Sequence, residues 1–143
     1  MPLSRLVTSA LPYANGPLHL GHLLEHIQTD IFVRASRFEG IPCAYICADD
    51  AHGTAIMLSA EKKGIPPEDY ISDIRNMHIQ ELAEFNIRHD NYHSTHSQEN
   101  KQLCEDFYQC IKNKGGIFTK TIEQYFCEDS GLFLSDRFIK GQC

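Results

Sequence analysis

Two histidines, His19 and His22, stand where a short apolar run gives way to a helical pattern, and their positions suit them to chemistry. Because they are three residues apart, both imidazoles would lie on one face of a first helical turn. The unpaired backbone N–H groups and the positive end of the helix dipole face the same place. The pattern predicts a site that binds a phosphate and stabilises the negative charge that grows when the phosphorus is attacked. Gly21 lacks a side chain, so a flat ring or a ribose could approach the backbone there.

A plainer interpretation is that the two histidines are surface residues or a helix cap. The residues just before them argue against it, since Pro12, Asn15 and Gly16 form a Pro-x-x-Asn-Gly turn signal directly ahead of the pair. A turn at this point carries the chain from a strand into a helix, which is where phosphate sites form in α/β proteins. The context therefore favours the binding site.

The elements around this turn are predicted from their periodicity. The run 6–10 predicts a short buried strand, and apolar residues at three- and four-residue steps predict a helix over 20–38. The run 43–48 is nearly continuous, which is typical of a strand covered on both faces. A strand, a crossover helix and a second strand make a βαβ unit, so the sheet is predicted to be parallel.

A second candidate site follows the second strand, at Asp49 and Asp50. In an open parallel sheet, ligands bind beyond the carboxyl ends of the strands. A carboxylate there could pair with a substrate ammonium group, and Gly53 would allow a close turn. One of the two aspartates is expected to cap the next helix and the other to face the ligand.

The rest of the chain is predicted to continue the α/β pattern and then to change character. Helices are expected over 54–63 and 67–85, a strand over 91–93, and a helix that Ser97 caps and that ends at 115–116. Beyond it, the run 117–126 alternates roughly and 129–131 resembles a hairpin turn. Residues 1–115 are therefore predicted to form one domain and 116–143 the start of a separate β-rich insertion.

Composition limits the class of protein. The chain has 143 residues, 42% of them hydrophobic, and a formal net charge of −6. Proteins that hold nucleic acid mainly through phosphates are basic, so this chain is expected to handle small substrates rather than to grip a polynucleotide. No run is long enough to span a membrane and no signal peptide is evident, so a cytoplasmic location is expected. Five of the six cysteines are expected to be buried thiols rather than disulfides, namely Cys43, Cys47, Cys104, Cys110 and Cys127.

The other histidines are open to several interpretations. His89, His93 and His96 form an H-x3-H-x2-H pattern that a metal could use, although surface roles, cap roles or proximity to the active site fit the loose spacing better. His26 and His78 lie on predicted helices among polar neighbours and are expected to be solvated.

Three blocks of sequence resemble class I aminoacyl-tRNA synthetases of the methionyl type. Residues 9–22 look like the HIGH signature of that class, and residues 48–54 and 90–97 are similar to later blocks of the same family. The resemblance runs the length of the chain. It implies an α/β fold, the first half of a Rossmann-type (HUP-like) parallel sheet with flanking helices, followed by the start of a connective insertion.

The resemblance also implies an activity: methionine is activated with ATP and Mg²⁺ to methionyl-adenylate and transferred to tRNA(Met). His19 and His22 would be catalytic and would contact the ATP phosphates, with Gly21 beneath the adenosine. The ATP site would also include the residues of the preceding turn, Pro12, Asn15 and Gly16. The methionine site would comprise Asp50 at the ammonium group, the backbone of Ala10, and the side chains of Leu11 and Tyr13.

The family pattern is incomplete here. Cys143 resembles the first zinc ligand of the connective insertion, but one thiolate cannot make the four-ligand site that Zn²⁺ needs, so zinc is expected only in the full-length parent. The later Lys-Met-Ser-Lys-Ser loop does not occur, so the chain is expected to be inactive alone. An exposed sheet edge would allow self-association. Two alternatives stay open: a small H-x-G-H nucleotidyltransferase, and a non-catalytic fragment that acts by binding a partner.

Overall fold

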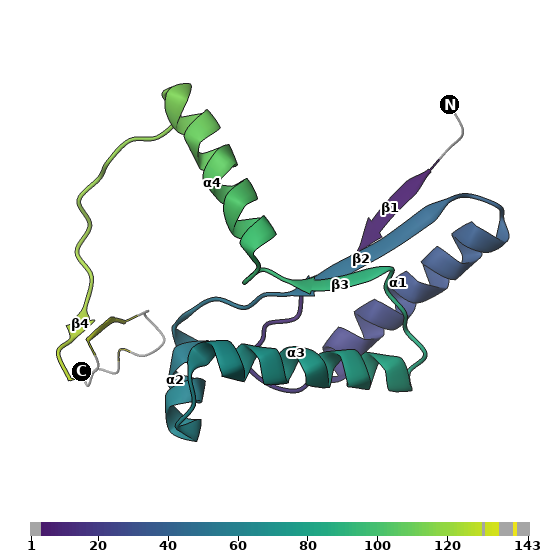
Figure 1. Ribbon diagram of the computed structural model, residues 1–143, viewed down its shortest axis with the longest axis horizontal. Helices are drawn as coiled ribbons and strands as arrows, with labels where there is room; N and C mark the ends of the chain where they lie inside the picture. Colours follow the sequence, from purple (N-terminus) through teal and green to yellow (C-terminus); the bar gives the residue numbers. More distant parts are fainter. Residues whose placement is uncertain (1–3, 130, 135–138, 140–143) are drawn as a thin grey trace. The chain divides into compact units, whose positions relative to one another are not determined.

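The computed structural model describes residues 4–129, 131–134 and 139 (Figure 1). They fall into two compact units, one up to Lys101 and one from Gln102 onwards. The first unit contains both candidate sites. Cys143 lies outside the described residues, so the structure does not test the prediction made for it.

A three-stranded parallel sheet organises the first unit. The strands are β1 (Arg5–Thr8), β2 (Cys43–Asp49) and β3 (Asn91–Ser94), in the order β1-β2-β3. Helix α1 (Leu20–Phe38) connects β1 to β2, while α2 (Thr54–Lys63) and α3 (Pro67–Glu84) connect β2 to β3. The βαβ unit and the parallel sheet predicted from the sequence are confirmed.

The helices that cross the sheet pack on one of its faces. Each connection moves the chain one strand further in the same direction, and right-handed crossovers then place their helices on the same side (Figure 1). Accordingly Val33 of α1 and Leu82 of α3 share a buried cluster with Tyr45 of β2. A second cluster joins α2 and α3 to the segment after β2, around Ile56 and Ile74.

The prediction that β2 is covered on both faces is wrong for the first unit. Tyr45, Cys47 and Asp49 are buried, but Ala44 and Ile46 on the alternate face are exposed, and Leu6 of β1 is 72% exposed. Because the crossovers occupy only one side of the sheet, no helix of this unit reaches the other. The apolar run 43–48 therefore includes residues on a face of β2 that the first unit leaves exposed.

The second unit consists of most of α4 (Gln98–Asn113) and a hairpin of β4 (Phe126–Cys127) and β5 (Leu132–Phe133). The cap is confirmed, since Ser97 Oγ accepts from the N–H of Asn100 at 3.1 Å. The antiparallel hairpin is confirmed too, but strand pairing in the described residues begins only at Phe126. No residue of α4 is buried, so the expectation of buried thiols is wrong for Cys104 and Cys110, which are exposed. In the part of the chain that the structure describes, the helices are all too short or too polar to cross a bilayer.

Candidate functional site

The two histidines of the H-x-G-H motif form a rigid pair at the N-terminus of α1. His19 is the N-cap residue, and its Nδ1 accepts from the backbone N–H groups of Gly21 at 3.1 Å and of His22 at 3.4 Å. In return, His22 Nδ1 accepts from the N–H of His19 at 3.4 Å, which completes a capping box built from imidazoles. The rings stack with their centroids 3.7 Å apart and their planes 15° from parallel.

This capping arrangement decides which ring nitrogens are available to a ligand. A ring nitrogen that accepts a hydrogen bond carries no proton, so each neutral imidazole has its proton on Nε2. The pKa of His22 is lowered by burial and by the neighbouring imidazoles of His19 and His78, which keeps this ring neutral. The pair therefore offers two Nε2–H donors beside the positive end of a helix dipole, a combination that suits an anion.

Gly21 leaves room for the pair itself. A Cβ at this position would lie 3.0 Å from Cε1 and 3.1 Å from Nδ1 of His19, so the capping ring would have to move by a few tenths of an ångström. The sequence suggested that Gly21 keeps space for a ligand, and the structure adds that it keeps space for the stacked imidazoles.

One face of α3 holds the turn that precedes the pair. Tyr70 Oη donates to the carbonyl of Asn15 at 3.0 Å, and His78 Nε2 donates to that of Gly16 at 2.7 Å. Glu81 Oε2 accepts from the N–H of Leu18 at 2.9 Å. These contacts give Asn15 and Gly16 a positioning role, because their backbone carbonyls are fastened to the helix. Asn15 is fastened a second time, where its Oδ1 accepts from Ser59 of α2 at 2.8 Å.

His78 also joins this turn to the sheet through a buried ion pair. Its Nδ1 donates to Asp49 Oδ1 at 2.8 Å, and both side chains are 1% exposed. Burial alone would lower the pKa of His78, but the hydrogen bonds to Asp49 and to the Gly16 carbonyl outweigh it, so the pKa is raised. Tyr92 of β3 donates to the same carboxylate oxygen, and burial together with that bond raises the pKa of its phenol.

The expectation that His26 and His78 are solvated is wrong, since both are buried. His78 occupies a stripe of α3 with Tyr70, Ile74 and Leu82, which recur every four residues and are all buried. A polar residue inside such a stripe was the signal in the sequence that could have placed His78 in the core.

The predicted methionine-site residues gather where β1 and β2 end. Tyr13 and Asp50 form an isolated parallel bridge, flanked by the bonds Ala14 N–H to Asp50 O at 2.8 Å and Asp50 N–H to Pro12 O at 2.9 Å. Asp50 is exposed, whereas Asp49 is buried. Neither aspartate caps α2, whose N-cap is Gly53 without a side-chain bond, so the expected capping role is wrong.

The residues just before Tyr13 differ in how exposed their side chains are. Pro12, assigned to the ATP site, is buried, while Leu11 and Ala10, assigned to the methionine site, are exposed, Leu11 at 41%. The N–H of Ala10 donates to Glu25 Oε1 of α1 at 2.5 Å, so its carbonyl is the backbone group that a ligand could use. Sequence reasoning missed Glu25, which ties the strand end to the helix that carries the histidine pair.

The H-x3-H-x2-H histidines do not converge. His93 pairs with Glu99 at 3.6 Å, and the His96 ring lies 5.3 Å from that of His52. His89 instead faces Tyr45 and His26 in the interior, with ring centroids 4.2 and 5.5 Å away. The pattern in the sequence is therefore not a single site.

Comparisons with known proteins agree with this fold. It is that of a class I synthetase domain, and the family described as "tRNA synthetases class I (M)" matches residues 5–143. The chain belongs to this family, as the resemblance predicted.

Individual relatives are similar along nearly all of the chain. It is 56% identical over 138 residues to a methionine–tRNA ligase of Psychrobacter sp. (strain PRwf-1), and 57% identical over 137 residues to one of Dichelobacter nodosus (strain VCS1703A). Each match covers 96% of this chain and 20% of the relative, so the chain spans about a fifth of the length of these curated relatives.

Solved structures show the same fold. Mycobacterium tuberculosis methionyl-tRNA synthetase in complex with methionyl-adenylate has a TM-score of 0.81 at 20% identity, over 96% of this chain and 27% of that one. A second structure of that enzyme bound by methionyl-adenylate has a TM-score of 0.78 at 20% identity, over 94% and 26%.

Proposed function

We propose that this chain supplies the ATP-binding half of the catalytic domain of a methionine–tRNA ligase. The full protein would activate L-methionine with ATP to methionyl-adenylate and transfer the methionyl group to tRNA(Met). Residues 1–115 would belong to the catalytic domain and residues 116–143 would begin a connective insertion. The predicted location remains the cytoplasm, where translation takes place.

The stacked histidine pair is the observation that carries this proposal. In the activation step a carboxylate oxygen of methionine attacks the α-phosphorus, and the bond to the bridging oxygen breaks to release pyrophosphate. Negative charge grows on the phosphate oxygens as this happens. His19 and His22 would stabilise it through their Nε2–H groups, already oriented by the capping box, and such preorganised donors lower the barrier because they need no rearrangement.

The second half of the site would position methionine. Asp50, exposed where β2 ends, would pair with the α-ammonium group, and the Ala10 carbonyl would accept from the same group. Leu11 and Tyr13 would contact the side chain, since a thioether packs favourably against a phenol ring. Adenylate formation is mostly positioning and charge stabilisation, so no strong base is needed.

The chain offers different ligands to the two expected metals, Mg²⁺ and Zn²⁺. The histidine pair offers N–H donors rather than the oxygen ligands that Mg²⁺ prefers, so Mg²⁺ would be held by the triphosphate and would neutralise part of its charge. Cys143 would be one thiolate of a zinc site that needs further ligands from the full-length protein.

Methionine-dependent ATP–pyrophosphate exchange by the full-length protein tests the proposal. We expect His19→Ala and His22→Ala each to reduce the exchange rate about 10²- to 10³-fold, the cost of removing one preorganised donor. His19→Asn is the matched control, because its amide oxygen can still cap the helix although it lacks Nε2–H. It should fold with the stability of the wild type and still lose exchange.

An exchange rate that stays within a few-fold of the wild type when both histidines are alanine would contradict the proposal. Adenylation of a phosphorylated cofactor precursor, without methionine-dependent exchange, would favour the small nucleotidyltransferase. A folded protein with neither activity would favour a non-catalytic fragment.

A further inference from the structure

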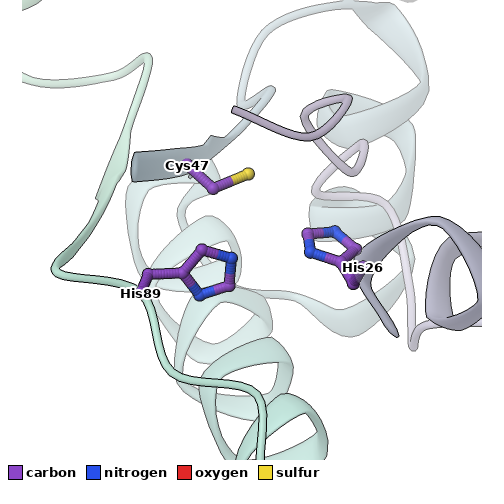
Figure 2. A group of neighbouring side chains, drawn as sticks. All are labelled: His26, Cys47 and His89. Carbon is purple, nitrogen blue, oxygen red and sulfur yellow. The ribbon is translucent and has the colours of Figure 1, made fainter. Parts of the chain in front are cut away.

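A largely buried cluster combines three side chains that ligate metals. His26 comes from α1, Cys47 from β2, and His89 from the segment before β3. One ring nitrogen of each histidine and the sulfur of Cys47 all lie within 4.8 Å of one another. Figure 2 shows the three side chains pointing toward one another from separate elements. None of them belongs to the proposed ATP or methionine site.

Two nitrogens of this cluster are buried without a hydrogen-bond partner. His26 is 1% exposed, and its Nε2 makes no hydrogen bond, as is also true of Nε2 of His89. Buried polar atoms in folded proteins are almost always paired, so an unpaired nitrogen in the core indicates a partner yet to be accounted for. Two such nitrogens beside a buried sulfur point to one shared partner.

The surroundings of His26 determine which of its two ring nitrogens keeps a free lone pair for this partner. Its Nδ1 lies 3.1 Å from Ser9 Oγ and 3.3 Å from Tyr45 Oη, and Ser9 Oγ also donates to Cys47 Sγ at 3.4 Å. With the proton on Nδ1 donated to these oxygens, Nε2 keeps a free lone pair. A hydrogen bond from the other ring nitrogen is the usual support of a histidine that ligates a metal.

The charge state of the cluster is compatible with a cation. Burial lowers the pKa of His26 and, together with the neighbouring His26 ring, lowers that of His89 to about 4, so both rings are neutral at physiological pH. Neutral imidazoles are the form that ligates metals. Burial raises the pKa of Cys47, which is thus a thiol until a cation displaces its proton.

We propose that His26, Cys47 and His89 bind one Zn²⁺ ion or a divalent cation of similar preference. Two nitrogens and one thiolate are ligands that Zn²⁺ favours, and a water molecule would take the fourth position. On binding, Cys47 releases its proton to solvent. Donor atoms around tetrahedral zinc lie about 3.5 Å apart, so the side chains would close by roughly 1 Å.

Such an ion would connect the elements that position the active site. It would join α1, whose first turn carries His19 and His22, to the central strand and to the segment that leads into β3. This site is separate from any that Cys143 would join, and it does not depend on the proposed catalytic activity.

Cobalt substitution tests the proposal on the chain of 143 residues. The chain is stripped with a chelator and titrated with Co²⁺, and the thiolate-to-cobalt charge-transfer band is followed together with far-ultraviolet circular dichroism. We expect the wild type to bind one ion per chain with this band. Cys47→Ala should abolish it, while Cys43→Ala, on the same strand but outside the cluster, should leave it unchanged.

The histidine contribution is tested with His89→Phe, which keeps an aromatic ring against Tyr45 but removes the ring nitrogens. We expect its Co²⁺ affinity to fall at least about tenfold, with unchanged circular dichroism. A band that persists in Cys47→Ala, or a folded wild type that binds no Co²⁺, overturns the proposal and assigns the unpaired nitrogens to water. If the stripped wild type is unfolded, Zn²⁺ must restore its helical signal, and a failure to do so overturns the proposal equally.

Discussion

Replacing His78 by alanine should destabilise the first unit more than any surface substitution. The imidazole is buried between Asp49 and the carbonyl of Gly16 and donates to both. Alanine removes both donors and leaves the carboxylate in the core with Tyr92 as its remaining donor among the described hydrogen bonds. The turn ahead of the histidine pair loses one of its attachments to α3 at the same time.

The expected loss in the free energy of unfolding follows from the Asp49 carboxylate that His78→Ala leaves buried without its charged partner. Breaking a buried ion pair by removing one partner costs about 3–5 kcal/mol, because the other charge stays desolvated and uncompensated. Total stabilities of domains are roughly 5–15 kcal/mol, so this is a large part of the whole. For a unit of about 100 residues, a loss of about 4 kcal/mol lowers the melting temperature by roughly 15–30 °C.

The contribution of His78 to stability should depend on pH in a defined direction. The pKa of His78 is raised above the reference value of 6.5, so the folded state holds its proton more tightly than the unfolded state does. Its contribution is therefore fully present below pH 6.5 and is lost as the pH rises through the folded-state pKa. The stability difference between wild type and His78→Ala should be largest at pH 6 and should narrow toward alkaline pH.

Urea unfolding at several pH values, in a buffer with chelator, measures both quantities. Gln80→Ala is the matched control, because Gln80 is exposed on the same helix and its removal should change stability by less than about 0.5 kcal/mol. A loss below about 1 kcal/mol for His78→Ala, or a difference that widens as the pH rises, would refute the buried ion pair.

Three further predictions concern the site and the sheet. Gly21→Ala should displace the ring of His19 by a few tenths of an ångström and slow ATP–pyrophosphate exchange by less than the about 10²-fold that a 1 Å misplacement costs, and a rate equal to the wild type would contradict the stacked arrangement. Gly53→Ala should cost about 1–3 kcal/mol in urea unfolding, because Gly53 has φ +127° and its Cβ would lie 2.7 Å from Tyr13 Oη; an unchanged midpoint would show that the backbone there is relaxed. Leu6→Lys should weaken any self-association of the chain measured by sedimentation, since a charge on an edge strand opposes pairing, and an unaltered association constant would place the contact elsewhere.

The sequence by itself determined the local elements and the placement of the histidine pair at the start of a helix. Periodicity placed α1 and α2, because the apolar spacing and the terminal glycines act within a few residues. The H-x-G-H spacing put His19 and His22 on one helical turn for the same local reason. The parallel sheet followed, since adjacent parallel strands need a crossover connection and the predicted helix supplies one.

Only the tertiary structure decided which polar residues are buried and with what. Asp49 and Asp50 are neighbours, and nothing in the sequence tells which of them faces a ligand. In the structure Asp49 pairs with His78 in the core, whereas Asp50 is exposed. His26 and His89 are 63 positions apart, and no spacing rule joins them to Cys47. These partners depend on how separate elements pack, and burial, which sets their charge and hydrogen bonding, arises only when the helices close over one face of the sheet.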